Sequence, residues 1–139
     1  GQALPMAIGA ALAVEAAGRK TLVLAGDGGF AVTLGELATA RQENADMAIL
    51  LMNDGGYGVI RNIQDAEFDG RRVYADLFNP DFGRLCAALD IPHRAVGDAT
   101  GLAAALQSAI AVDGPAVVEV DMRAFGDFAQ PFAGPPARK

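Results

Sequence analysis

The sequence predicts an α/β fold in which helices cover both faces of a parallel sheet, and two observations support this prediction. First, three short apolar runs have the character of strands, namely "TLVLA" at 21–25, "MAILLM" at 47–52 and "PAVVEVD" at 115–121. Second, segments with helical periodicity separate these runs. Strands that are almost wholly apolar are typical of parallel sheets buried on both faces. With 139 residues and no internal repeat, the chain fits a single domain.

The chain is expected to open with a helix over residues 4–17. Leu4, Ile8 and Leu12 recur at helical spacing, and Gly18 stands where a C-cap would end the helix. The run "TLVLA" follows as a strand that we expect to be buried on both faces.

A second helix is expected between the first two strands. Thr33 and Glu36 have the spacing of a capping box, which predicts a helix that runs to about residue 44. The run "MAILLM" is then the second buried strand, and it ends at Asn53 and Asp54.

The middle of the chain predicts a helix, a loop and a further helix. The segment "GYGVIRNIQDAEF" at 56–68 predicts a short helix, and "DGRRVYADLF" at 69–78 is a polar loop with little periodicity. The triplet "NPD" that follows predicts an N-cap at Asn79 and Pro80 at the first helical position. The apolar face of that helix carries Phe82, Leu85, Cys86 and Leu89.

The last part of the chain predicts one more strand–helix–strand unit. The segment "HRAV" at 93–96 is a short strand candidate, and "PAVVEVD" is the last strand. The helix between them is marked by Leu102, Leu106 and Ile110. We expect one domain over residues 1–130 and an extended, Pro- and Gly-rich tail over 131–139.

Composition excludes several function classes. The net charge of −6 and the absence of a basic run argue against nucleic-acid binding. Because no run of about 18 apolar residues occurs, no membrane helix is predicted. The single Cys86 excludes a disulfide framework, fits a reducing, cytoplasmic compartment and is expected to be a buried packing thiol. The single His93 indicates no zinc site and is expected to be structural or at the surface.

Two glycine-rich segments carry the chemistry: the first turn, "GDGG" at 26–29, and the second turn, "NDGGYG" at 53–58. Each follows a strand, and ligands of parallel sheets bind at the carboxyl ends of strands. The glycines of the first turn permit a ligand to approach closely, and their N–H groups form a cradle for an anion. Because Asp27 would repel a diphosphate, a Mg²⁺ ion is expected between them, with Asp54 and a backbone carbonyl of the second turn as further ligands.

Other interpretations of these turns also exist. Asp-Gly pairs often make tight turns without any ligand, and each turn alone fits that interpretation as well as the functional one. A dinucleotide site is a poor match because "GDGGFA" lacks the third glycine of G-x-G-x-x-G. A P-loop is excluded because no G-K-[ST] follows.

The order of the motifs resembles one enzyme family. "GDG", followed after a helix and a strand by N-[ND]-x-x-[YL]-G, is similar to the thiamine diphosphate signature of the acetohydroxyacid synthase and benzoylformate decarboxylase superfamily. The segments "LPMAIGAALA", "GELATARQEN", "NPDFGRLCAAL" and "GPAVVEVD" extend the resemblance over roughly residues 1–122. The resemblance implies a thiamine-diphosphate-binding fold and a diphosphate-binding module at the C-terminal end of a larger enzyme.

The resemblance also implies roles for single residues. Asp27, Asp54 and the carbonyl of Gly56 would hold Mg²⁺, and the N–H groups of Gly28, Gly29, Gly56 and Tyr57 would meet the diphosphate. The full set of cofactor-binding residues is then Gly26, Asp27, Gly28, Gly29, Asp54, Gly56, Tyr57 and Gly58. Since the family more often carries Asn where Asp54 stands, we expect extra charge beside the phosphates and a stronger dependence on Mg²⁺.

Two positions bear on the reaction. Ile63 stands where acetohydroxyacid synthases typically carry a tryptophan that shapes the acceptor pocket, which weakens an acetolactate assignment and leaves room for a decarboxylase or another carboligase. Arg61 could face a carboxylate substrate, but the usual burial habits of Arg favour a solvated side chain on a helix.

The resemblance implies that the whole enzyme is a 2-oxo acid decarboxylase or carboligase, a lyase or transferase, assembled as a homodimer or homotetramer. The glutamate that activates the cofactor comes from a separate pyrimidine-binding module, and the residue that bends thiamine lies upstream. We therefore expect an N-terminally truncated piece that is inactive alone, contributes no catalytic residue and self-associates through exposed apolar surface. The alternative is a non-catalytic cofactor-binding or assembly module that requires a partner chain.

Overall fold

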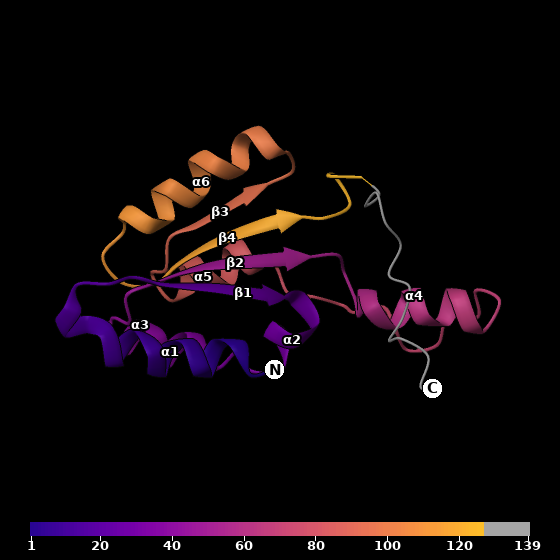
Figure 1. Ribbon diagram of the computed structural model, residues 1–139, viewed down its shortest axis with the longest axis horizontal. Coiled ribbons are helices and arrows are strands. Elements are labelled where there is room, and N and C mark those ends of the chain that lie inside the picture. The colour runs from indigo at the N-terminus through magenta and orange to yellow at the C-terminus, as the bar shows by residue number, and fades with distance from the viewer. Residues whose placement is uncertain (127–139) are drawn as a thin grey trace, which may run out of the picture.

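A computed structural model describes residues 1–126 of the chain, and its centre is a four-stranded sheet in the order β1-β2-β4-β3 (Figure 1). The strands are β1 (Thr21–Gly26), β2 (Met47–Asn53), β3 (His93–Val96) and β4 (Ala116–Asp121). Every neighbouring pair is parallel. The predicted α/β fold with a parallel sheet is confirmed.

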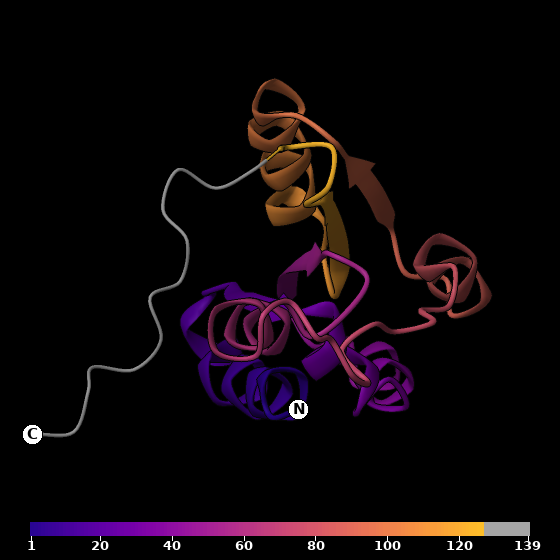
Figure 2. The ribbon, with the colours of Figure 1, turned by 90° about the vertical axis from the view of Figure 1, so that its right-hand side faces the viewer.

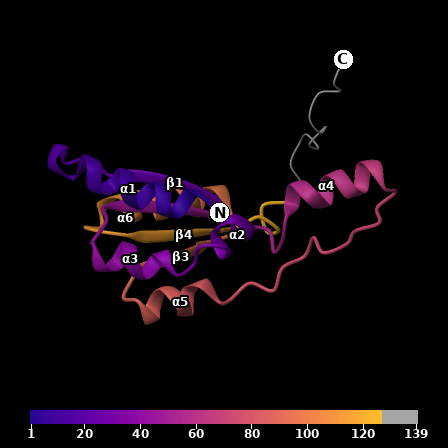
Figure 3. The same cartoon turned by 90° about the horizontal axis from the view of Figure 1, so that it is seen from below.

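Helices lie on both faces of this sheet. They are α1 (Ala3–Val14), the 3₁₀ turn η1 (Glu15–Ala17), α2 (Asp27–Ala31), α3 (Glu36–Gln42), α4 (Gly58–Glu67), α5 (Phe82–Ala88) and α6 (Ala99–Ala111). Buried residues of α1, α2, α3 and α5 share one apolar core with β1 and β2, while α6 forms a second core on the opposite face. Figure 3 shows that α4 lies apart from these layers, beyond the carboxyl end of the sheet.

The predicted opening helix is correct, including its end. The α-helix gives way to η1, and Gly18 then adopts a left-handed conformation with φ of 60°. The N–H of Gly18 donates to the carbonyl of Glu15 at 2.8 Å, which satisfies a terminal carbonyl of the helix. Leu4 and Ile8 are buried, whereas Leu12 is exposed.

The expectation that β1 is buried on both faces is wrong. Val23 and Ala25 are buried, but Leu22 and Leu24 are 60% and 68% exposed. The physical reason is that β1 lies at an edge of the described sheet, and α6 packs on β2, β3 and β4. One face of β1 therefore presents leucines to solvent.

The capping box predicted at Thr33 is also wrong. α3 begins at Glu36 with Gly35 at its N-cap, and Glu36 N–H donates to the backbone carbonyl of Thr33 at 2.9 Å. Because the N–H of Thr33 already donates to Phe30 at 3.1 Å, residue 33 continues the turn after α2 and lacks the extended conformation of an N-cap. Its hydroxyl is buried, with no hydrogen-bond partner among the described residues.

The start of α5 differs from the prediction by two residues. Asp81 is the N-cap, and its Oδ1 accepts a hydrogen bond from the N–H of Arg84 at 2.9 Å. Pro80 and Asn79 lie before the helix. The side chain of Asn79 is consequently free of the capping role and reaches the first turn instead.

The single cysteine is a packing residue, as predicted. Cys86 is buried on α5, and this burial, together with the charge of Glu119, raises its pKa to about 11. Such a thiol is protonated at neutral pH and is a poor nucleophile.

None of the helices within residues 1–126 has the length and apolar character needed to cross a membrane. The tail predicted to be extended, 131–139, lies outside the described residues, as does the end of the predicted domain.

Candidate functional site

The first and second turns meet at the carboxyl end of the sheet. β1 and β2 are neighbours, with Gly26 opposite Met52, so both strands end at the same edge. Figure 2 views the molecule from this edge, with α4 in front. A pocket of about 310 Å³ lies there. It is lined by Gly26, Asp27, Gly28, Gly29, Met52, Asp54, Gly56, Tyr57, Gly58, Val59, Ile60 and Met122, which include all the predicted binding residues.

Asp27 is the only buried charged residue of residues 1–126. Its Oδ2 accepts hydrogen bonds from the N–H of Gly56 at 3.0 Å and from Nδ2 of Asn79 at 2.6 Å. A carboxylate can be buried only when such partners replace its water. Its other oxygen, Oδ1, receives no hydrogen bond from the described residues.

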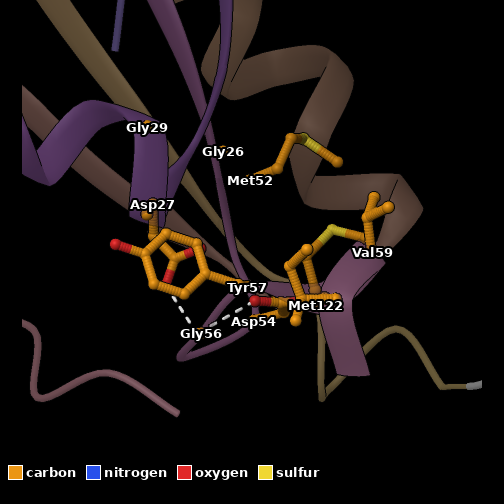
Figure 4. A pocket seen from close by; sticks show the side chains of 12 residues that line it. Gly26, Asp27, Gly29, Met52, Asp54, Gly56, Tyr57, Val59 and Met122 are labelled. Carbon is orange, nitrogen blue, oxygen red and sulfur yellow. Dashed lines mark hydrogen bonds between the residues drawn. The ribbon is translucent and has the colours of Figure 1, made fainter. Parts of the chain in front are cut away.

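Asp54 lies beside Asp27 around a single donor. The N–H of Gly56 also contacts Oδ1 of Asp54 at 3.1 Å, so oxygens of both carboxylates lie within 3.1 Å of one nitrogen. Figure 4 shows these two hydrogen bonds converging on Gly56. The second turn is fixed from outside by residues 75–77, because Tyr57 N–H donates to the carbonyl of Ala75 at 2.8 Å.

Glycines of both turns are required by close approach, and positions 28 and 58 show this. A Cβ at Gly28 would lie 2.6 Å from Cε1 of Tyr57, so the ring of the second turn rests directly on the backbone of the first. A Cβ at Gly58 would lie 2.1 Å from Oδ2 of Asp54. These contacts explain why glycines stand here and show that the two turns pack as one unit.

The donor set fits a hard divalent cation with a diphosphate. Two carboxylates and the carbonyl of Gly56 are oxygen ligands of the kind that Mg²⁺ prefers. Within residues 1–126, no group of three or more His, Cys, Asp or Glu side chains is arranged to hold a metal ion. The structure corrects one detail, since the N–H groups of Gly56 and Tyr57 already donate inside the protein and are not free for phosphate.

Asn79 is a residue of this site that sequence reasoning missed. Its Nδ2 donates to Asp27 and also to Oδ1 of Asn53 at 3.1 Å, so that one amide links both turns. The rings of Phe30 and Phe82 meet edge to face at 5.8 Å, which holds α5 beside α2 and brings Asn79 within reach. The proline after Asn79 favoured a helix start instead, which concealed this role.

The polar contacts continue away from the pocket. Nδ2 of Asn53 donates to Oε1 of Glu119 at 2.7 Å, and Oε2 of Glu119 lies 2.8 Å from Nε2 of His93. The expected structural role of His93 agrees with this partly buried contact. A chain of hydrogen-bonded side chains thus runs from Asp27 through Asn79 and Asn53 to the edge strand β3.

The solvated side chain expected for Arg61 is wrong. The side chain is only 15% exposed, and its Nη2 lies 2.9 Å from Oδ1 of Asp54. The same nitrogen donates to the backbone carbonyl of Asp54 at 3.0 Å, and Arg123 Nε donates to that carbonyl at 3.1 Å. Both arginine contacts depend on how α4 and the segment after β4 fold back, and no local pattern indicates them.

Ile63 is half-buried on α4 and does not line the pocket.

Comparison with known proteins agrees with the resemblance to thiamine diphosphate enzymes. The family described as "Thiamine pyrophosphate enzyme, C-terminal TPP binding domain" matches residues 1–120. The mitochondrial acetolactate synthase catalytic subunit of Aspergillus candidus is 35% identical over 120 residues, which cover 86% of this chain and 17% of that protein. The acetolactate synthase isozyme 1 large subunit of Escherichia coli K12 is 33% identical over 122 residues, covering 86% of this chain and 21% of that protein.

A solved structure extends the similarity to the fold. The thiamine diphosphate-dependent 4-hydroxybenzoylformate decarboxylase of Rhodococcus jostii RHA1 superposes with a TM-score of 0.77 at 31% identity, over 86% of this chain and 22% of that one. The chain thus spans about a fifth of the length of these relatives. With its parallel sheet, its two glycine-rich turns and a family match over 1–120, the chain belongs to the thiamine pyrophosphate enzymes, as their C-terminal TPP-binding domain.

Proposed function

We propose that this chain binds the diphosphate of thiamine diphosphate through a Mg²⁺ ion. Asp27, Asp54 and the carbonyl of Gly56 are the proposed protein ligands. The observation that carries the proposal is that the Gly56 N–H joins the two carboxylates at one pocket, while Oδ1 of Asp27 and Oδ2 of Asp54 receive no hydrogen bond from the described residues. Two carboxylates held this close favour a divalent cation between them.

The diphosphate is proposed to contact the N–H groups of Gly28, Gly29 and Gly58. The first two lie in the opening turn of α2 and the third at the start of α4, where backbone N–H groups have no partner within the helix. Backbone N–H groups at these positions favour an anion. The ring of Tyr57 covers Gly28 and would help to exclude water from this side of the pocket.

The full-length protein that contains this chain is proposed to be a 2-oxo acid decarboxylase or carboligase, that is, a lyase or transferase. Bound thiamine diphosphate supplies the nucleophilic carbon for such chemistry. The residues described here bind and orient that group, and no acid or base among them is assigned to catalysis. The relatives comprise both acetolactate synthases and a 4-hydroxybenzoylformate decarboxylase, so the aldehyde or acyloin product is decided by a substrate panel.

We also propose the extent of the module, its assembly, its inactivity when isolated and its compartment. Residues 1–130 would form the module, which would act within a homodimer or homotetramer that includes a pyrimidine-binding module. The isolated chain would release no carbon dioxide from pyruvate. The cytoplasm suits a chain whose single cysteine is a free, buried thiol, although the Aspergillus candidus relative is mitochondrial.

Calorimetric titration of the full-length protein with thiamine diphosphate, with and without Mg²⁺, tests the metal assignment. We expect tight binding with Mg²⁺ and weak binding with a chelator present. Asp27→Asn should remove the Mg²⁺-dependent part, and Asp65→Asn, a carboxylate outside the pocket on α4, is the matched control. Unchanged Mg²⁺ dependence in Asp27→Asn would refute the proposal.

A further inference from the structure

We propose that Arg61 is a positioning residue that neutralises Asp54, so that an aspartate can serve at the second metal position without adding charge to the site. The inference rests on the proposed function, because it concerns how Asp54 meets Mg²⁺ and the diphosphate.

The guanidinium of Arg61 contacts two oxygen atoms of Asp54. Nη2 lies 2.9 Å from Oδ1 of the carboxylate and 3.0 Å from the backbone carbonyl of the same residue. Nη1 is 3.4 Å from Oδ1 of Asp76, a looser and more exposed contact. The side chain of Arg61 is 15% exposed and that of Asp54 33% exposed, so the pair is partly shielded from water and is more strongly coupled than a surface pair.

These contacts divide the two oxygens of Asp54. Oδ1 is occupied by Arg61 and by the N–H of Gly56. Oδ2 faces Gly58 at the pocket and receives no hydrogen bond from the described residues. Asp54 therefore offers one oxygen to the pocket, as an asparagine would, and the charge on the carboxylate is balanced by the arginine beside it.

The balance matters because the pocket would also hold a diphosphate. With Arg61 present, Asp27 remains the only uncompensated carboxylate of the proposed ligands. Without Arg61, two carboxylates would face the diphosphate across one divalent ion, and the added repulsion would weaken cofactor binding. Arg123 would not replace Arg61, since its Nε donates to the backbone carbonyl of Asp54.

Two other roles for Arg61 make different predictions. If Arg61 only holds the second turn in shape, through Asp76 and the Asp54 carbonyl, its loss would cost the same whatever side chain stands at position 54. If Arg61 contacts a carboxylate substrate, its loss would raise the KM for the 2-oxo acid and leave cofactor binding unchanged. Only charge compensation predicts that Asp54→Asn rescues the loss of Arg61.

The experiment is a double-mutant cycle in the full-length protein, read out as the calorimetric Kd of thiamine diphosphate at fixed Mg²⁺. Arg61→Gln should raise this Kd about tenfold in the native background, and at most about twofold in the Asp54→Asn background. Arg61→Lys keeps the charge and should stay within about threefold of the native Kd. Arg72→Gln, which removes an exposed arginine paired with Asp65, is the matched control and should leave the Kd unchanged.

Equal losses from Arg61→Gln in both backgrounds would overturn the inference, and so would an unchanged Kd in the native background. If Arg61→Gln does not fold, Arg61→Lys is measured in both backgrounds instead. A loss of affinity as large in the Asp54→Asn background as in the native one would overturn the inference, because only the geometry of the guanidinium would then matter. Failure of the proposed function would look different, since Asp27→Asn would then retain Mg²⁺-dependent binding.

Discussion

The first and second turns are alike in sequence and unlike in construction. Asp27 in the first turn is buried and is held by neutral donors, one from Gly56 and one from Asn79. Asp54 in the second turn is one-third exposed and is held by a cation, Arg61. The first turn is therefore built by hydrogen bonds from distant parts of the chain, and the second by an ion pair with the helix that follows it.

This difference indicates different tolerances. A buried carboxylate that is held by specific donors leaves little room for substitution, because a replacement without a side-chain oxygen leaves those donors without an acceptor. A partly exposed carboxylate beside an arginine tolerates substitution more readily. An aspartate whose charge is balanced by arginine and an uncharged asparagine each present one side-chain oxygen to the pocket. We therefore expect changes at the first turn to be the more damaging.

The largest effect is expected from Asp27→Asn. The substitution keeps the shape of the side chain and removes the charge that would face Mg²⁺. We expect Mg²⁺-dependent cofactor affinity to fall by more than about 100-fold, above the range found when only an outer partner of a metal ligand is lost. Isothermal titration at several Mg²⁺ concentrations measures it, and a fall smaller than that of Asp54→Asn would reverse the proposed ranking of the turns.

Asn79→Ala should give the next largest effect. It removes the donor that links Asp27 to Asn53, so the carboxylate loses a partner that orients it. A loss of about tenfold in Mg²⁺ affinity is expected. Asp81→Ala, two residues away, is the control because it removes the N-cap of α5. It should lower the free energy of unfolding by about 1 kcal/mol and leave the Kd for Mg²⁺ unchanged.

Gly28→Ala tests whether the turns pack as a unit. The added methyl group would collide with the Tyr57 ring, and overpacking of this kind costs about 1–3 kcal/mol. Chemical denaturation of the single variant and of Gly28→Ala with Tyr57→Ala measures the coupling. Removing the ring should relieve the cost of the methyl group; additive costs would show that the contact is not close in solution.

The smallest effect is expected at the exposed ion pair between Asp65 of α4 and Arg72. The hydrogen bond from Arg72 holds the pKa of Asp65 below its usual value. A lowered pKa in the folded state means that the pair stabilises the protein above the unfolded pKa near 3.8 and loses this contribution as the pH falls through the lower folded value. Thermal melts of Asp65→Asn at pH 7 should show a slight decrease that disappears at acidic pH, and a large decrease at pH 7 would contradict the exposed character of the pair.

The sequence predicted the parts of the fold that local patterns determine. The four strands, the cap at Gly18 and the motif residues around the pocket follow from periodicity, glycines and motif order. Leu22 and Leu24 were wrongly placed because burial on the second face of a strand depends on which helix covers it. Asn79 and Arg61 were misjudged for a related reason, since their partners lie 52 and 7 residues away and are set by tertiary packing.

The exposed leucines of β1 bear on how the isolated chain behaves in a test tube. Leu22 and Leu24 alternate with buried residues along an edge strand, and an apolar edge of this kind is a template for pairing with another copy. When the chain is purified alone, we expect its apparent molar mass, measured by light scattering, to rise with its concentration. Leu24→Lys places a charge on this exposed part of β1, outside the pocket, and should reduce the self-association of the isolated chain.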